Sequence, residues 1–269
     1  MKWSVLYEKA IRPDGSLYFP ERLTKEFLDE TRRTMGSYLF ANQYQNEVMP
    51  EGGQPFKKEW LRYYQALPEI KRTFGFIDPA ISQAKEADFT GVVIIDVDAD
   101  QKWYLKYAQR FKISPTEIIA LMFKLHAQFK FNCLAIEDVA YQKALLYMLD
   151  EEMRRRKVLL PVKGIHPGTD RTKEDRILGL VPRFEWNRIL IAQGLHDFEI
   201  EYAQFPRSSH DDLLDPLSQL EQSVTYPEKV KVSPDEKPHP SDPKYESWYI
   251  RNIHKQREAQ ERGRDFDFE

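Results

Sequence analysis

The sequence of 269 residues contains only one cysteine, Cys133, and no long apolar run. A single cysteine excludes an intrachain disulfide and a thiolate zinc cluster, so we expect Cys133 to be a small buried hydrophobic residue. No apolar stretch approaches the roughly 18 residues of a membrane-spanning helix, and the amino terminus lacks the profile of a signal peptide. These absences predict a cytoplasmic protein that makes no contact with a membrane.

The sequence also lacks an excess of basic residues. Its net charge is -3 and its isoelectric point is near 6.1, whereas domains that bind nucleic acid are usually basic overall. Local clusters of lysine and arginine can still give an acidic protein an affinity for phosphate. The contents of 31% charged and 13% aromatic residues indicate a globular protein with a polar surface.

Composition divides the chain into three parts. Residues 1–70 predict a helical lead-in with helices at 23–35 and 38–46. Residues 71–226 alternate between strand and helix patterns and form the predicted main domain. Residues 227–269 are rich in proline and charge, and we expect an extended or disordered tail.

The main domain begins with three strand patterns, at 74–78, 90–97 and 102–111, and a turn at 98–101 joins the last two. We expect these three strands to be antiparallel. Helices and strands then alternate: a helix opened by the capping-box pair Ser114 and Glu117, a strand at 133–137, a helix at 141–156, a strand at 158–162, a helix from 172, a strand at 188–192, a helix at 197–205 and a last helix at 208–222.

Carboxylates follow two of the predicted strands. Asp78 ends the first strand directly before Pro79, which cannot continue the ladder, and Glu137 ends the fourth. The amino-terminal turn of the last helix contains His210, Asp211 and Asp212. Each acid alone could be a turn residue or a helix cap. Their positions at the carboxyl ends of strands, where open α/β sheets bind ligands, instead indicate a site.

This order of elements is typical of the ribonuclease-H-like fold, an α/β fold whose mixed sheet has three antiparallel strands followed by parallel strands, flanked by helices. In that fold the first and fourth strands are neighbours, so Asp78 and Glu137 would face each other across roughly 4.8 Å. The last helix would bring Asp211 and Asp212 to the same place. Because crowded carboxylates repel one another, such a site requires a cation, and Mg²⁺ or Mn²⁺ prefers oxygen ligands of this kind.

Four segments together resemble the nuclease domain of the large terminase subunit of tailed bacteriophages. They are Phe-Gly-Phe-Ile-Asp78-Pro-Ala, Asp88-Phe-Thr-Gly-Val-Val, Leu-Ala-Ile-Glu137 and Ser-Ser-His210-Asp-Asp212-Leu-Leu-Asp215. The resemblance implies that Asp78, Glu137 and either Asp212, which we favour, or Asp211 hold two metal ions that cut concatemeric viral DNA during genome packaging. It gives Asp88 and His210 auxiliary roles near the metals.

The resemblance also implies partners and a location. These are double-stranded DNA, a portal protein and a small terminase subunit, in the host cytoplasm rather than in the virion, with a monomeric isolated domain. The chain departs from the family in two respects. It lacks the Gly-x-x-x-x-Gly-Lys-Ser/Thr run of an ATPase motor, so residues 1–70 resemble the segment that follows an absent motor. Pro216 should also bend the last helix.

Basic side chains near the expected site are candidates for contact with the DNA backbone: Arg154, Arg155, Arg156, Lys163, Arg171, Lys173 and Arg176. A solvated helix face explains each of them equally well. Trp103 and Trp186 are expected in the core. Two other functions remain open, namely another ribonuclease-H-like nuclease, such as a junction resolvase or an exonuclease, and a non-catalytic module that docks a portal or another partner.

Overall fold

The computed structural model describes residues 6–47, 53–69, 71–79, 89–137, 142–166, 171–208, 211–228 and 245. The chain divides into two units, Met1–Glu228 and Lys229–Glu269. The first unit contains every helix and strand described below. Within the described ranges, no helix combines the length and the apolar character needed to cross a membrane.

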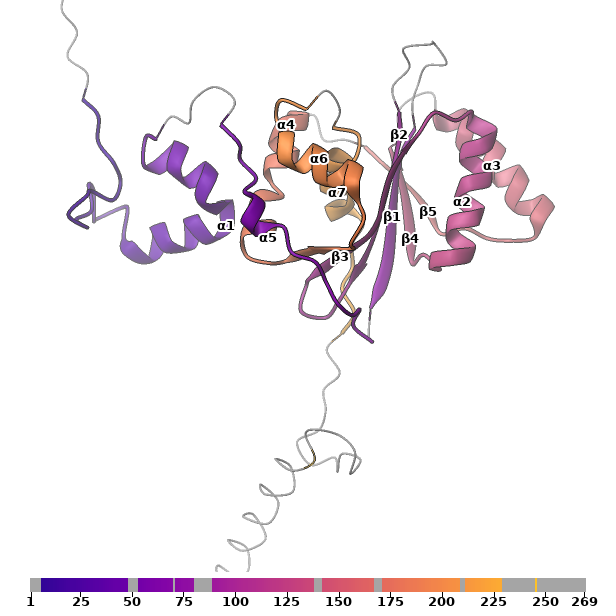
Figure 1. Ribbon diagram of the computed structural model, residues 1–269, viewed down its shortest axis with the longest axis horizontal. Coiled ribbons are helices and arrows are strands. Elements are labelled where there is room, and N and C mark those ends of the chain that lie inside the picture. Colours follow the sequence, from indigo (N-terminus) through magenta and orange to yellow (C-terminus); the bar gives the residue numbers. More distant parts are fainter. Residues whose placement is uncertain are drawn as a thin grey trace, which may run out of the picture. The chain divides into compact units, whose positions relative to one another are not determined.

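The centre of the first unit is a six-stranded sheet with the order β5-β4-β1-β2-β3-β6 (Figure 1). Its strands are β1 (Arg72–Asp78), β2 (Thr90–Val97), β3 (Trp103–Phe111), β4 (Cys133–Glu137), β5 (Val162–Ile165) and β6 (Ile189–Ile191). β1, β2 and β3 pair antiparallel, while β4 lies parallel to β1 and β5 parallel to β4. The predicted mixed sheet, with the first and fourth strands as neighbours, is confirmed, and β6 extends it beside β3.

The fifth strand begins later than the predicted 158–162. Pro161 has no backbone N–H to give to a ladder, and its carbonyl accepts the N–H of Leu134 at 2.9 Å. Regular pairing with β4 therefore starts at Val162, opposite Leu134.

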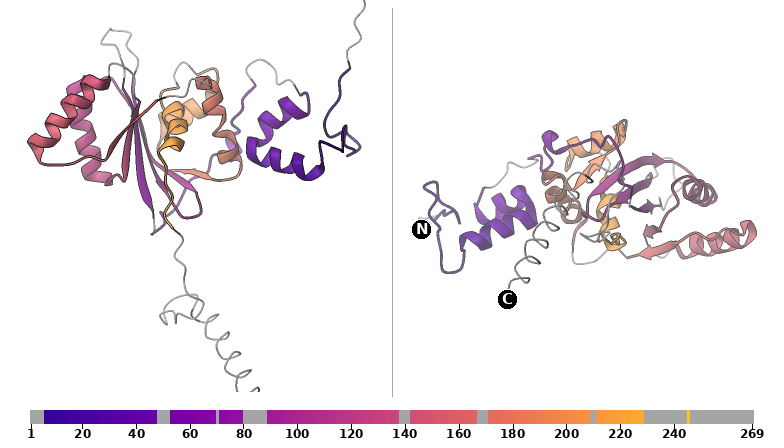
Figure 2. Two further views of the ribbon diagram at one scale, coloured as in Figure 1. Left: turned by 180° about the vertical axis from the view of Figure 1, so that it is seen from behind. Right: turned by 90° about the horizontal axis from the view of Figure 1, so that it is seen from below.

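Alternate residues of the central strands enter two separate cores. Phe74 and Phe76 of β1 and Val93 of β2 belong to one core, and Ile77 and Val92 belong to the other. This period of two places α4 (Lys173–Leu178), α5 (Val181–Glu185), α6 (His196–Gln204), α7 (Leu214–Gln219) and the short η2 (Leu220–Gln222) on the first face, and α2 (Pro115–Phe129) and α3 (Gln142–Arg156) on the second (Figure 2).

The amino-terminal segment contains the two predicted helices, joined across a kink under the single label α1 (Lys25–Tyr44). The bend is at Gly36, whose φ of 79° suits a residue without a side chain. A Cβ atom at Gly36 would lie 3.3 Å from Pro182, and the N–H of Ser37 donates to Glu185 at 2.8 Å. Gly36 therefore allows α1 to pack closely on α5.

The last helix is shorter than predicted. α7 starts at Leu214, so Asp211 and Asp212 lie in the segment before the helix rather than in its first turn. Pro216 then falls in the first turn, where a backbone N–H has no partner within the helix, so no bend is needed. The expectation of a bent helix was wrong for this reason.

Candidate active site

Asp78 and Glu137 lie side by side at the carboxyl ends of β1 and β4. The parallel register pairs Ile77 with Ile136, so the next residue of each strand is a direct neighbour. Because Phe76 faces the first core, Asp78 two residues later faces the same side of the sheet, toward α7. A hydrogen bond joins the side chains of Asp78 and Glu137.

The Asp78 carboxyl group keeps a proton at neutral pH. Burial, the hydrogen bond to Glu137, and the charges of Glu137 and Asp215 raise the pKa of Asp78 to about 8, although the charge of Lys173 acts in the opposite direction. A hydrogen bond between two carboxyl oxygens requires one of the groups to be protonated, and the raised pKa provides that proton.

Lys173 is a cation whose charge lowers the pKa of Asp78. Its ammonium Nζ donates to Oδ1 of Asp211 at 2.6 Å and lies 4.0 Å from Oδ2 of Asp215. Burial lowers the pKa of Lys173, but the hydrogen bond to Asp211 and the three nearby acids raise it overall. We predicted Lys173 as a DNA contact, and the structure places it among the acids.

Asp215 lies at the candidate site, although the sequence pattern gave it no predicted role. Its side chain is buried and forms a bidentate ion pair with Arg176, at 3.1 and 3.0 Å, and its Oδ atoms also accept from Ser218 and Gln219. Arg176 is therefore held by Asp215 instead of standing free on a helix face. The spacing of four residues between Asp211 and Asp215 was the available signal.

Asp212 lies against the end of β2, but its carboxylate faces another cation. A Cβ atom at Gly91, the residue paired with Asp78, would come within 2.0 Å of the Asp212 carbonyl oxygen, so only glycine permits this approach. Oδ2 of Asp212 lies 4.0 Å from Arg110, which also pairs with Asp197 at 3.6 Å. Of the acids in this segment, Asp215 raises the pKa of Asp78, and Asp211 binds the lysine that lowers it.

Glu201 of α6 fixes the segment that carries these aspartates. Its carboxylate is buried and accepts the backbone N–H groups of Leu213, at 3.0 Å, and Leu214, at 2.6 Å. Burial raises the pKa of Glu201 to about 7, against the effect of those hydrogen bonds, and the charge of Asp212 adds to the increase. Nothing in the local sequence pattern indicated this residue.

The donor set fits a hard divalent cation only in part. Asp88 and His210, both predicted near the metals, lie outside the described residues. Among the residues that are described, no three acidic, histidine or cysteine side chains are grouped closely enough to hold a metal ion. The Asp78 and Glu137 oxygens suit Mg²⁺ or Mn²⁺, and the ammonium of Lys173 provides positive charge between Asp211 and Asp215.

Four further basic residues that we predicted to contact DNA have protein partners in this structure. Arg154 pairs with Asp150 at 2.6 Å, and Arg155 and Arg156 both pair with Glu152, whose pKa they lower to about 2. Lys163 donates to the carbonyl of Gln222 at 3.2 Å. All these basic residues are exposed or partly exposed, so their contact with DNA stays a prediction.

Comparison with known proteins gives structural similarity without sequence similarity. No family model matches the chain, and no curated protein sequence matches it. Solved structures that resemble it include the large terminase nuclease of the thermophilic phage G20c with bound magnesium (TM-score 0.42, 13% identity, 62% of this chain and 92% of that one). The yeast mitochondrial Holliday junction resolvase Ydc2 is also similar (TM-score 0.38, 11% identity, 72% and 90%). A third is RuvC of T. thermophilus in complex with a Holliday junction substrate (TM-score 0.33, 16% identity, 55% and 89%).

Proposed function

We propose that this protein is a metal-dependent nuclease that hydrolyses phosphodiester bonds of double-stranded DNA, as the nuclease domain of a viral large terminase. The proposal depends above all on one observation, the placement of Asp78 and Glu137 side by side at adjacent strand ends. Such a pair destabilises the fold at neutral pH, because a carboxyl group with a pKa of about 8 cannot ionise there as it does in the unfolded chain. Acids that are kept at this cost are typical of functional sites.

The surrounding residues have defined roles in this function. Asp78 would lose its proton and hold the divalent ion together with Glu137, with Asp211 or Asp215 as a further ligand. When bound, such ions activate water and stabilise the leaving oxygen of a phosphodiester. Lys173, once released from Asp211, can reach the negative charge of a bound phosphate. Arg176 keeps Asp215 in place, and Glu201 keeps the preceding segment in place.

Plasmid cleavage tests the proposal. The full chain should nick and linearise supercoiled plasmid with Mn²⁺ or Mg²⁺ and be inactive in EDTA. Asp78→Asn should abolish cleavage, because an amide cannot replace the anionic ligand. Asp29→Asn, which removes an exposed carboxylate on α1, is the matched control and should cleave normally. Cleavage by Asp78→Asn at the normal rate would remove the nuclease assignment.

Substrate preference then decides between the terminase and its alternatives. A terminase nuclease should cut long linear duplex without a preference for branches. Faster cutting of a four-way junction would identify a resolvase, and digestion only from ends would identify an exonuclease. Binding to a portal protein without cleavage under either metal would instead support the non-catalytic docking module.

A further inference from the structure

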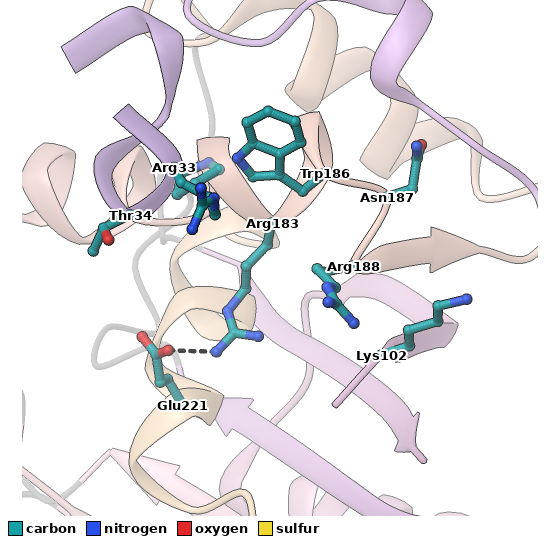
Figure 3. A pocket seen from close by; sticks show the side chains of 10 residues that line it. Arg33, Thr34, Lys102, Arg183, Trp186, Asn187, Arg188 and Glu221 are labelled. Carbon is teal, nitrogen blue, oxygen red and sulfur yellow. Dashed lines mark hydrogen bonds and ion pairs between the residues drawn. The ribbon is translucent and has the colours of Figure 1, made fainter. Parts of the chain in front are cut away.

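A cavity lies on the same side of the sheet as the acid pair but at the opposite end. It has a volume of about 710 Å³ and is formed by side chains from α1, the β2–β3 turn, α5, the segment before β6 and η2 (Figure 3). Its lining residues are Arg33, Thr34, Lys102, Gly179, Pro182, Arg183, Trp186, Asn187, Arg188 and Glu221. This volume is within the usual range for small-molecule sites.

The cavity is basic although the chain as a whole is acidic. Arg33, Lys102, Arg183 and Arg188 line it, against the single acid Glu221, in a protein whose net charge is -3. The four basic side chains come from four different segments of the chain, so the cluster is not one solvated helix face. This concentration of positive charge favours an anionic ligand.

Two of these cations are held in position. The guanidinium of Arg183 lies over the ring of the buried Trp103, 4.4 Å from its centroid, and donates to Glu221 at 2.5 Å. Arg188 donates to the carbonyl of Asp100 at 2.9 Å. Because these contacts already restrain the two side chains, the side chains would lose less conformational entropy when a ligand binds.

The cavity also presents an exposed aromatic surface. Trp186, which we predicted in the core, is 48% exposed at the carboxyl end of α5. Trp186 and Arg183 are three residues apart, which places them on the same side of a helical turn, and Figure 3 shows both side chains at the cavity beside Arg188. An exposed indole beside arginines offers a planar surface together with hydrogen-bond donors for phosphate.

We propose that this cavity binds a nucleotide unit, with the base stacked on Trp186 and the phosphate held by Arg183, Arg188 and Lys102. The unit could be a free nucleotide or an unpaired nucleotide within a DNA strand, because both present the same base and phosphate. An acidic peptide would satisfy the cations but would leave the indole face unused. Stacking on an aromatic residue contributes about 1–3 kcal/mol per base, which corresponds to roughly 5- to 150-fold in affinity.

The cavity is separate from the acid pair. Six residue steps along β2, from Gly91 opposite Asp78 to Val97 opposite Trp103, span about 20 Å at roughly 3.3 Å each. That distance corresponds to about six nucleotide steps of B-form DNA at roughly 3.4 Å. The binding proposal goes beyond the nuclease function and does not require it.

Binding to the full chain in EDTA tests the proposal without cleavage. The probes are a fluorescein-labelled oligothymidylate of about 12 nucleotides, measured by anisotropy, and AMP as a competitor. Trp186→Ala should weaken binding at least fivefold, and Trp186→Phe should restore most of it because a ring face remains. Lys102→Ala should weaken binding and reduce the salt dependence by about 0.7 in slope, as expected for one lost phosphate contact.

The controls remove the same groups elsewhere. Tyr147→Ala removes an exposed aromatic ring and Lys124→Ala an exposed cation, both from helices on the other face of the sheet, and both should bind normally. Competition by AMP would indicate that a single nucleotide fills the cavity, and binding of the oligonucleotide alone would indicate a strand. Unchanged binding by Trp186→Ala, or equal competition by a polyglutamate peptide, would overturn the proposal.

Discussion

The substitution Asp78→Asn should make the metal-free protein more stable while it abolishes cleavage. In the folded protein Asp78 is hydrogen-bonded to Glu137, and its pKa is about 8, compared with an ordinary value of 3.8. Asparagine resembles the protonated acid in shape, and its amide N–H can donate to Glu137. It therefore keeps the hydrogen bond and removes the group whose ionisation opposes folding.

The size of the effect follows from the two pKa values. Between pH 3.8 and 8 the folded protein binds a proton that the unfolded chain has lost, so stability falls as the pH rises through this window. At pH 7 the difference of about 3 pKa units, at roughly 1.4 kcal/mol each, amounts to about 4 kcal/mol. Asp78→Asn should recover about this amount at pH 7 and almost nothing at pH 4.

Thermal or urea unfolding in EDTA, at pH 4 and pH 7, measures the difference. Asp96→Asn is a control with the opposite expected sign, since the fully buried Asp96 is paired with Lys106 at 3.1 Å and loses that partner. Addition of Mn²⁺ should stabilise the wild type and leave Asp78→Asn unchanged. A variant that is no more stable than the wild type at pH 7, or as strongly stabilised at pH 4 as at pH 7, would refute the claim that Asp78 is protonated in the folded protein.

Three further substitutions test the surroundings of the acid pair. Gly91→Ala puts a Cβ atom 2.0 Å from the Asp212 carbonyl, so it should cost about 1–3 kcal/mol in urea unfolding and reduce plasmid cleavage. Lys173→Met leaves the acids uncompensated, so it should lower the melting temperature in EDTA, and Mn²⁺ should reverse the loss. Arg176→Met leaves the buried Asp215 unpaired and should cost about 3–5 kcal/mol in urea unfolding, whereas normal stability would contradict the importance of that pair.

The sheet could be predicted because its pattern is local and repetitive. Phe74 and Phe76 alternate with the oppositely facing Ile77, and Pro79 follows the last strand residue, so both the period and the end of β1 are visible in sequence. The start of α7 was not predictable in this way. It depends on Glu201 of another helix, whose carboxylate accepts the N–H groups of Leu213 and Leu214.

The site was predictable only where position within a strand determines function. Asp78 and Glu137 could be proposed because each follows an apolar strand, and the topology makes those strands neighbours. The roles of Asp215 and Lys173 depend on contacts across 38 or 39 residues, between α4 and the segment at α7. No pattern within either segment specifies which cation meets which acid.

Asp78 and Asp96, acids of neighbouring strands, show why the Asp78 pair supports a functional site rather than structural stability. Asp96 has its own cation, Lys106, and accepts a hydrogen bond from Thr73 at 2.7 Å, which is how a fold normally accommodates a buried charge. Asp78 instead faces Glu137, another acid, and the ammonium of Lys173, which lowers the pKa of Asp78, is bound to Asp211. Since the same sheet contains the stabilising arrangement, the unfavourable one at its carboxyl end supports the proposed metal site, where a bound cation would compensate both acids.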